Sequence, residues 1–136
     1  MSVPAHKDQA IIDNAAVVLN EMRALCKSLV YAALLTDDGF EVVSLPSYHQ
    51  TDGSRMASMA SSMQALSDAV ARELKMGSSE YIIIATQSGY VLQLRVPSQT
   101  LVLSALFGDD ETLGKALSIS RLSAQKMSAL MSPAAV

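Results

Sequence analysis

The sequence predicts a compact α+β sandwich whose elements follow the order helix, two strands, helix, three strands, helix. Three stretches repeat apolar residues at the helical period, and five short apolar runs are separated by turn residues. At 136 residues the chain has the length of one domain, and half of its residues are hydrophobic, enough for a core without disulfides. We therefore expect a single domain over residues 1–136, with its core at about 9–131.

The first helix is expected to begin after Asp8, whose side chain suits an N-cap. Apolar residues then recur at spacings of three and four, which is the pattern of an amphipathic helix. They are Ile12, Ala15, Leu19, Met22, Cys26 and Leu29. A free Cys inside an apolar stripe usually behaves as a small hydrophobe, so Cys26 is interpreted as a core residue.

A hairpin follows in "LVYAALLTDDGFEVVSL", where two β-rich runs flank the turn at residues 36–39. Asp-Gly supplies the positive φ of a tight turn, so the paired Asp residues are interpreted as turn formers and not as a general acid and base. Residues 46–54 are polar and contain Pro and Gly, which predicts a loop. His49 in this stretch has no partner motif and is interpreted as a solvated loop residue.

The second helix is expected from Arg55 to about Lys75, with Gly77 at the position just past its end. Its apolar stripe is expected to face the protein's own sheet and consists of Met56, Met59, Met63, Leu66, Val70 and Leu74. Methionine thioethers can bind soft metals, but a continuous stripe favours core packing. The other side of the helix carries a ridge of small residues, Ser58, Ser62, Ala65 and Ala69, which either packs on a second helix or forms an Ala/Ser-rich solvent face.

Three strands are expected in residues 81–108, joined by turns at 87–89 and 97–99 as an antiparallel meander. The first of them is apolar on both faces, with Tyr81 and Ile83 on one side and Ile82 and Ile84 on the other. Burying both faces requires helices on both sides of the sheet. This strand also ends the meander, and an exposed apolar edge favours pairing with a second copy of the chain.

The third helix is expected to follow the acidic residues 109–111 and to end before Pro133. Its apolar face consists of Leu113, Leu117, Ser120, Ala124, Met127 and Met131. Residues 108–116 contain Gly-Lys at the start of this helix, as a phosphate-binding loop does. The spacing between the glycines is wrong, Ala116 replaces the magnesium-binding hydroxyl residue, and three carboxylates would repel the phosphates.

Composition and motifs exclude several classes of function. A net charge of −3 argues against nucleic-acid binding, which needs clustered Lys and Arg. There is one Cys, no signal-peptide pattern at the start, and no apolar run near the roughly 20 residues that span a bilayer. The sequence contains no catalytic triad, metal-ligand or cofactor motif. We expect a cytoplasmic protein that is not an enzyme, does not insert into membranes, and binds no cofactor or metal.

Three stretches resemble the roadblock family of dynein-light-chain-related domains and together cover most of residues 30–127. They are "YAALLTDDGFEVVS", "LSDAVARELKMGSSEYIIIATQSGYVLQLRV" and "LVLSALFGDDETLGKALSISRLSAQKM". Leu113-Gly114 is similar to the Asn-Leu-Gly entry of the family's last helix, with Glu111-Thr112 in place of the Asn. The order and spacing of the stretches carry the resemblance, since each stretch alone is common.

The resemblance implies a roadblock-like, profilin-like fold: a five-stranded antiparallel sheet with the second helix on one face and the first and third on the other. It also implies a homodimer through the second helix and the adjacent edge strand. The expected interface residues are Ser58, Ser62, Ala65, Ala69, Tyr81 and Ile83.

Family members act as non-catalytic platforms for small Ras-like GTPases, sometimes raising the rate of GTP hydrolysis, or as assembly subunits. If a GTPase docks on the paired second helices, the candidate contacts are Arg55, Ser61, Gln64, Asp68, Arg72 and Lys75. Two alternatives stay open. One is a structural module that assembles with other roadblock-like chains or a larger complex without a GTPase. The other is a small domain that binds a metal or ligand through its methionine stripe or sheet face.

Overall fold

The structure, a computed structural model, describes residues 3–45 and 53–131. His49 and Pro133, on which two of the sequence interpretations rest, lie outside these ranges. The elements in chain order are η1 (Ala5–Lys7), α1 (Gln9–Leu25), β1 (Leu29–Thr36), β2 (Glu41–Leu45), α2 (Gly53–Glu73), β3 (Tyr81–Thr86), β4 (Gly89–Arg95), β5 (Leu101–Gly108) and α3 (Leu113–Met131). Apart from the short 3₁₀ turn η1, this is the predicted order of helices and strands.

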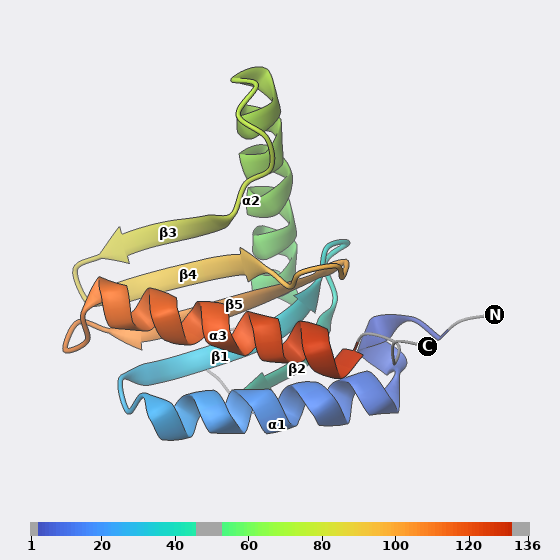
Figure 1. Cartoon of the computed structure of the whole chain (residues 1–136), viewed down its shortest axis with the longest axis vertical. Helices are drawn as coiled ribbons and strands as arrows, with labels where there is room; N and C mark the ends of the chain where they lie inside the picture. Colours follow the sequence, from blue (N-terminus) through green and yellow to red (C-terminus); the bar gives the residue numbers. More distant parts are fainter. Residues whose placement is uncertain (1–2, 46–52, 132–136) are drawn as a thin grey trace.

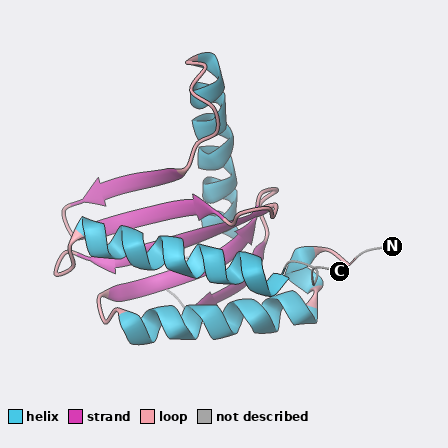
Figure 2. Cartoon of the chain, viewed as in Figure 1, coloured by secondary structure: helices cyan, strands magenta, loops and turns pink. Residues whose placement is uncertain are grey.

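The five strands form one antiparallel sheet in the order β2-β1-β5-β4-β3, so β2 and β3 are its edges. Helices α1 and α3 lie side by side on one face, and α2 alone lies on the other (Figure 1). Figure 2 shows that α2 runs across the strands and extends past β3 at its C-terminal end. The predicted sandwich, with the second helix opposite the first and third, is confirmed.

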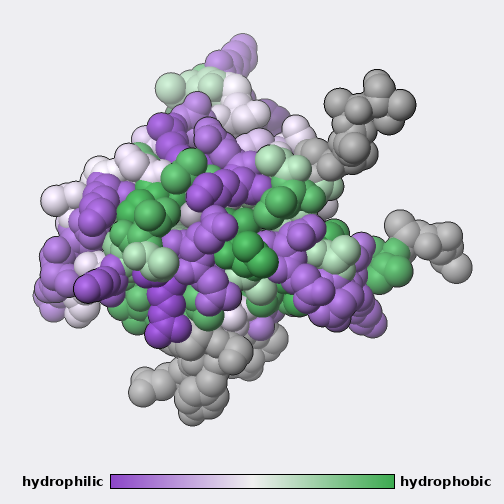
Figure 3. Space-filling model, turned by 60° about the horizontal axis from the view of Figure 1, so that its bottom comes forward, coloured by the Kyte–Doolittle hydropathy of each residue, from purple (hydrophilic) through white to green (hydrophobic). Residues whose placement is uncertain are grey.

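The main core fills the space between α1, α3 and the sheet. Its largest fully buried side chains include Leu19, Met22, Leu34, Phe107 and Met127. A second, smaller cluster on the α2 face consists of Tyr31, Ala33, Leu35, Ala57 and Ala60. On the face that Figure 3 brings forward, hydrophobic patches alternate with hydrophilic ones. The α2 side of the sheet thus has a smaller buried apolar cluster than the side that α1 and α3 cover.

Helix α1 begins where the sequence predicts and ends earlier. The Asp8 side chain accepts hydrogen bonds from the backbone N–H groups of Ala10 at 3.0 Å and Ile11 at 3.5 Å, so Asp8 is the N-cap. The helix stops at Leu25, because Cys26 takes an extended conformation with φ −142° and Leu29 already belongs to β1. The periodic apolar pattern continued past the true helix end, because both Cys26 and the start of β1 contribute to the same core.

Helix α3 presents the predicted face to the core, where Ser120, Ala124 and Met127 are buried. The Thr112 hydroxyl accepts a hydrogen bond of 3.2 Å from the backbone N–H of Lys115, which caps the first turn. The acidic residues 109–111 precede the helix and form a turn. Thr112 therefore supplies the helix start that the family pattern assigns to an Asn.

Two glycines are required by the hairpins that build the sheet. Gly39, at φ 99°, makes the turn between β1 and β2 that the Asp-Gly pair predicted. Gly89 opens β4 beside β5, and a Cβ at this position would lie 1.9 Å from the carbonyl oxygen of Phe107. The close approach of the two backbones leaves room only for glycine.

Cys26 packs in the core, as predicted, and is 1% exposed. Its thiol donates a hydrogen bond of 3.3 Å to Oε2 of Glu111. Burial, followed by this hydrogen bond, raises the pKa of the Cys26 thiol above its ordinary value. The thiol therefore stays protonated at neutral pH, which is the opposite of what a nucleophile requires.

Candidate functional site

The side of α2 that meets the sheet is made of small and polar residues. Ala57 is 0% exposed, Ala60 2% and Gln64 4%, while Met59 is 48% exposed and Leu66 66%. The prediction that the methionine stripe faces the protein's own sheet is therefore wrong. The stripe lies on a neighbouring side of the helix and is open to solvent over much of its length.

The reason lies in a polar side chain on the sheet. Gln93 of β4 is 1% exposed, and its Nε2 donates hydrogen bonds to the Ala60 carbonyl at 2.9 Å and to Oε1 of Gln64 at 3.3 Å. Burying amide N–H groups without acceptors is costly, so the helix turns toward the sheet the side that offers two acceptors to Gln93 Nε2, although Gln93 Oε1 stays without a partner. The small side chains of Ala57 and Ala60 let the α2 backbone come close enough for these bonds.

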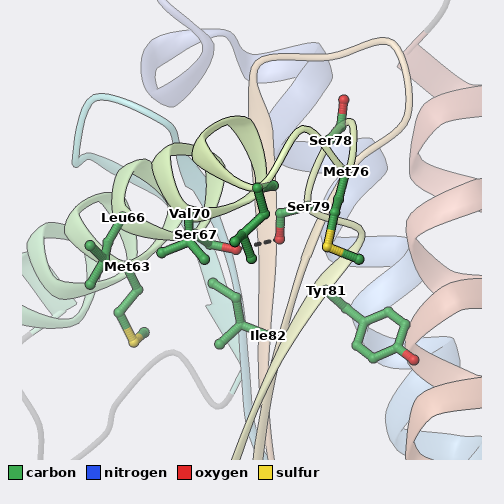
Figure 4. A pocket seen from close by; sticks show the side chains of 11 residues that line it. Met63, Leu66, Ser67, Val70, Met76, Ser78, Ser79, Tyr81 and Ile82 are labelled. Atoms are coloured by element: carbon green, nitrogen blue, oxygen red, sulfur yellow. Dashed lines mark hydrogen bonds between the residues drawn. The ribbon is translucent and has the colours of Figure 1, made fainter.

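The exposed stripe forms one wall of an apolar groove between α2 and β3 (Figure 4). The groove has a volume of about 600 Å³. It is lined by Met63, Leu66, Ser67, Val70, Ala71, Leu74, Met76, Ser78, Ser79, Tyr81 and Ile82. A hydrogen bond between the hydroxyls of Ser67 and Ser79 ties α2 to the segment that leads into β3. A concave apolar surface of this kind marks an interaction site.

Strand β3 continues the apolar surface along the edge of the sheet. Among the described strands it pairs only with β4, so the backbone groups on its outer side have no strand partner within residues 3–45 and 53–131. Ile82 stands opposite Gln93 and therefore faces α2, together with Ile84, while Tyr81 and Ile83 face the other way. Tyr81, Ile83 and Ile84 are 36–37% exposed. The predicted edge strand with two apolar faces is confirmed.

The start of β3 is also fixed to α3. The guanidinium of Arg121 lies 5.2 Å from the centre of the Tyr81 ring and forms an ion pair of 3.2 Å with Glu80. Figure 4 shows the Tyr81 ring pointing away from the groove. These contacts join the start of β3 to α3 at the strand end nearest α2.

The ridge of small residues lies on the side of α2 that is turned away from the sheet. Ser58, Ser62 and Ala65 are exposed, and Ala69 is half-buried. The Ser62 hydroxyl donates a hydrogen bond of 3.1 Å to the carbonyl of Ser58 within the same helix. The ridge thus adjoins the apolar stripe, and both surfaces are largely exposed in the described part of the chain.

The structure separates the six candidate GTPase contacts. Arg55 is exposed near the start of α2, and the half-buried Ser61 donates its hydroxyl to the Asp37 carbonyl at 2.7 Å. Gln64 is buried beneath the helix, where it binds Gln93 and does not face a partner. The other three gather at the C-terminal end of α2, where the chain turns toward β3.

These three residues, Asp68, Arg72 and Lys75, line a polar hollow of about 630 Å³ together with Gly77, Ser78 and Arg95. The carboxylate of Asp68 and the guanidinium of Arg95 form an ion pair of 2.9 Å. The helix ends at Glu73, earlier than predicted, and Lys75 takes the left-handed conformation just past its end, with φ 57°. Gly77, which the sequence places at that position, has a positive φ of 85° two residues later.

Arg95 is the site residue that the sequence reasoning missed. It lies at the end of β4, 27 positions after Asp68, in a strand whose other residues are mostly apolar. A charged residue in such a run is a weak signal, because the ends of strands commonly carry charge. Only the packing of α2 across the sheet brings Arg95 to Asp68.

Neither a cluster of metal-binding side chains nor a membrane-spanning helix occurs in the described residues. Over residues 3–45 and 53–131, no three His, Cys, Asp or Glu side chains converge to hold a metal ion. Within the same ranges, no helix combines the length and hydropathy needed to cross a bilayer. The chemistry that the exposed surface offers is apolar association on one flank of α2 and charge recognition on the other.

Comparison with known proteins identifies the family. The model of the Roadblock/LC7 domain matches residues 21–105, which is more than half of the chain. The chain belongs to the Roadblock/LC7 domain family. The match runs from the second half of α1 to β5 and so includes α2, the groove and β3. Among curated protein sequences, none matches this chain significantly.

Solved structures show the same Roadblock/LC7 fold at low sequence identity. The chain is similar to the gliding protein MglB from Thermus thermophilus, with 16% identity, a TM-score of 0.77, and coverage of 88% of this chain and 90% of that one. It is also similar to an MglB structure with a tetrameric arrangement, with 18% identity, a TM-score of 0.78, and coverage of 88% of this chain and 89% of that one. LokiProfilin2, solved in a complex with rabbit actin, shares 14% identity and a TM-score of 0.59, with coverage of 85% of this chain and 96% of that one. The predicted roadblock-like and profilin-like fold is confirmed.

Proposed function

We propose that this Roadblock/LC7 protein is a non-catalytic homodimer that binds a small Ras-like GTPase and modulates its hydrolysis of GTP. The observation that carries the proposal is the apolar groove between α2 and β3, which is open in the single chain. The family resemblance supplies the class of partner. The lining of the groove is mainly apolar and contains no His, Cys, Asp, Glu, Lys or Arg, which supports a surface for a protein.

Two incomplete surfaces that a second copy would complete support the homodimer. On the α2 face of the sheet, Ile84, Val91 and Leu106 lie in one row across β3, β4 and β5, and none of them is fully buried. The C-terminal half of α2 extends past β3 with Leu66 and Val70 exposed (Figure 1). If two β3 edges pair antiparallel about a two-fold axis, each α2 reaches over the sheet of the other copy. Each stripe then covers the other copy's exposed row.

Tyr81 and Ile83 keep the interface role that the sequence assigned to them, because they belong to the pairing edge. In this arrangement the apolar stripe contacts the sheet of the other copy. The ridge formed by Ser58, Ser62, Ala65 and Ala69, which the sequence assigned to the dimer interface, lies next to that contact and is proposed instead as the docking surface. The ridge stays open on the side of α2 that faces away from both sheets. A flat ridge of small residues lets the backbone of a docking protein approach closely.

The GTPase is proposed to dock on this outer surface of the paired helices. Arg55, Arg72 and Lys75 are exposed there, with Ser61 and Asp68 half-buried beside them. Gln64 is left out of the contact set, because it is committed to Gln93. The docking surface is therefore a flat small-residue strip with charged residues at both ends of each helix.

The test is GTP hydrolysis by a Ras-like GTPase from the same source, measured with and without this protein. We expect the GTP-loaded form to bind and its hydrolysis rate to change. The variant Ala65→Lys, which places a charge on the ridge and leaves the groove intact, should keep the dimer and lose the GTPase. Absence of both binding and rate change for every Ras-like GTPase of that source would refute the proposal.

A second function is favoured by the same groove. Because the groove is apolar and lacks charged groups, it would accept the edge of another roadblock-like chain as well as a second copy of this one. The protein would then be a structural module of a larger assembly without a GTPase. Native mass spectrometry of the complex purified from its source distinguishes the two functions, since a heterodimer without a GTPase supports only the second.

A further inference from the structure

The polar hollow at the C-terminal end of α2 is separate from the apolar groove. At about 100° per residue, Asp68 and Arg72 lie on the opposite flank of the helix from Leu66 and Val70. The hollow has a volume of about 630 Å³, and Arg95 of β4 contributes to its lining together with Arg72 and Lys75. Formation of the proposed dimer through the apolar stripe would leave this flank of α2 open.

The charges in the hollow are unbalanced. It holds three cations, Arg72, Lys75 and Arg95, and one carboxylate, Asp68. Asp68 is already paired with Arg95 at 2.9 Å. In the part of the chain that the structure describes, Arg72 and Lys75 take part in no ion pair. The hollow therefore carries a local excess of two positive charges in a chain whose net charge is −3.

The arrangement of donors suits carboxylates. Arg95 uses Nη2 for Asp68 and is 35% exposed in its side chain, so part of its guanidinium remains accessible from the hollow. The backbone N–H of Lys75 is bonded to the carbonyl of Arg72 at 3.0 Å, which holds these two cations on the same closing turn of the helix. Three cations around an open hollow can receive two or more carboxylates at once, which a single small anion would not exploit.

We propose that this hollow is a docking site for an acidic segment of a partner protein, one that presents Asp and Glu side chains to Arg72, Lys75 and Arg95. The occupant is identified by charge complementarity, since the local charge is opposite to that of the whole chain. Asp68 acts as an internal competitor that holds Arg95 until the segment arrives. The inference does not depend on the partner being a GTPase, because it concerns the charge of the docked segment alone.

The experiment uses the full chain and an acetylated, amidated peptide of alternating Glu and Gly, followed by fluorescence anisotropy and by amide chemical shifts. The matched neutral peptide alternates Gln and Gly. We expect shifts at Arg72, Lys75, Ser78 and Arg95 with the acidic peptide only, and an affinity that falls as salt is added. Binding of both peptides alike, or shifts that are absent from α2 and β4, would overturn the proposal.

Charge reversal provides the first pair of variants. The double variant Arg72→Glu, Lys75→Glu should lower the affinity for the acidic peptide about tenfold or more, because two attractive charges become repulsive. The control is Arg23→Glu with Lys27→Glu, which changes the net charge equally on exposed residues near the end of α1. Equal losses in the two double variants would mean that only the net charge matters, and would refute a localised site.

The second pair of variants tests whether Asp68 competes with the acidic peptide for Arg95. Asp68→Asn keeps the acceptor that Gln64 Nε2 uses at 3.3 Å and removes the negative charge, so Arg95 is released. The acidic peptide should bind about threefold more tightly, which is the size of an exposed ion pair. Asp13→Asn is the control, because Asp13 also accepts from a Gln four residues earlier, at 2.8 Å, and faces solvent on α1. Unchanged affinity in Asp68→Asn contradicts the proposed role of Arg95.

Lys75→Gly separates binding from folding. Lys75 has φ 57°, so glycine relieves the strained conformation and the variant should melt at the same or a higher temperature. Its affinity for the acidic peptide should nevertheless fall severalfold. Retained affinity would show that Lys75 serves only the end of the helix. Inorganic phosphate is added as a competitor at an equal concentration of anionic groups. If it displaces the peptide, the hollow is a site for small anions, and the proposal of a protein segment as its occupant is overturned.

Discussion

The substitution Leu66→Ala tests the proposed dimer at the most exposed residue of the apolar stripe on α2. Leu66 is 66% exposed in the single chain and lines the groove between α2 and β3. Burying a whole leucine side chain contributes about 1.5–3 kcal/mol, so covering the exposed two thirds contributes about 1–2 kcal/mol. Truncation to alanine removes most of this contribution from the interface.

A two-fold interface contains the residue twice, which doubles the effect. The dimer should lose about 2–4 kcal/mol, and its dissociation constant should rise about 30- to 900-fold. The folded single chain should be nearly unaffected, because the side chain is mostly in water there and alanine favours the helix. Sedimentation equilibrium over a dilution series measures the dissociation constant, and circular dichroism checks the fold.

The matched control is Leu122→Ala, a leucine that is 44% exposed on α3, on the other side of the sheet. This variant should dimerise as the unmodified chain does. An unchanged dissociation constant for Leu66→Ala would refute the assignment of the groove to the dimer. A loss of the same size in Leu122→Ala would move the interface to α3.

Three further predictions concern the fold itself. Gly89→Ala should destabilise the protein by several kcal/mol, because a Cβ there overlaps the backbone of β5, whereas Gly114→Ala in α3 meets no atom within 4 Å and should stabilise it by about 0.5–1 kcal/mol in thermal unfolding. Gln93→Ala should cost about 2–4 kcal/mol in urea unfolding, because it opens a cavity and removes the amide that α2 binds. Burial, and then the Glu41 carboxylate, raise the pKa of Tyr31 to about 12. The folded state thus disfavours the phenolate. The contribution of neutral Tyr31 to the free energy of unfolding is therefore complete below pH 10 and is lost as the pH rises through about 12. Glu41→Gln should lower this pKa in an absorbance titration, although burial should keep it above 10.

The sequence predicts the fold well because local signals and burial agree in most elements. Asp8 caps a helix, Gly39 makes a turn, and the alternation in residues 81–108 gives a meander, each for a reason that needs no distant contact. The boundary at Cys26 was missed, because an apolar pattern records burial and a helix end depends on backbone conformation. Lys75 ends α2 with a positive φ that sequence preference assigns to glycine.

The orientation of α2 could not be predicted, because the helix has two sides that could be buried and only one sheet in its own chain. The hydrophobic stripe is the usual choice, and here it would have left Gln93 without partners. The exposed stripe at Met59, Leu66 and Val70 supports the proposed intermolecular contact. Gln93, a glutamine within an otherwise mostly apolar strand, is the sequence feature that indicates a polar contact between the sheet and α2.

The candidate site was predicted only in part, because it combines residues that are distant in sequence. The α2 residues Asp68, Arg72 and Lys75 were found from one helix. Their partner Arg95 depends on the angle at which α2 crosses the sheet. Periodicity within an element gives no information about that angle.

Two copies of this chain are proposed to form a platform for a Ras-like GTPase. Light scattering coupled to size exclusion tests this proposal directly, with the chain alone and with the GTPase of its source in GTP-loaded and GDP-loaded forms. We expect twice the 14.4 kDa chain mass for the protein alone, and a heavier complex with the GTP-loaded GTPase. A mass of 14.4 kDa that does not change when either form of the GTPase is added would contradict the proposal.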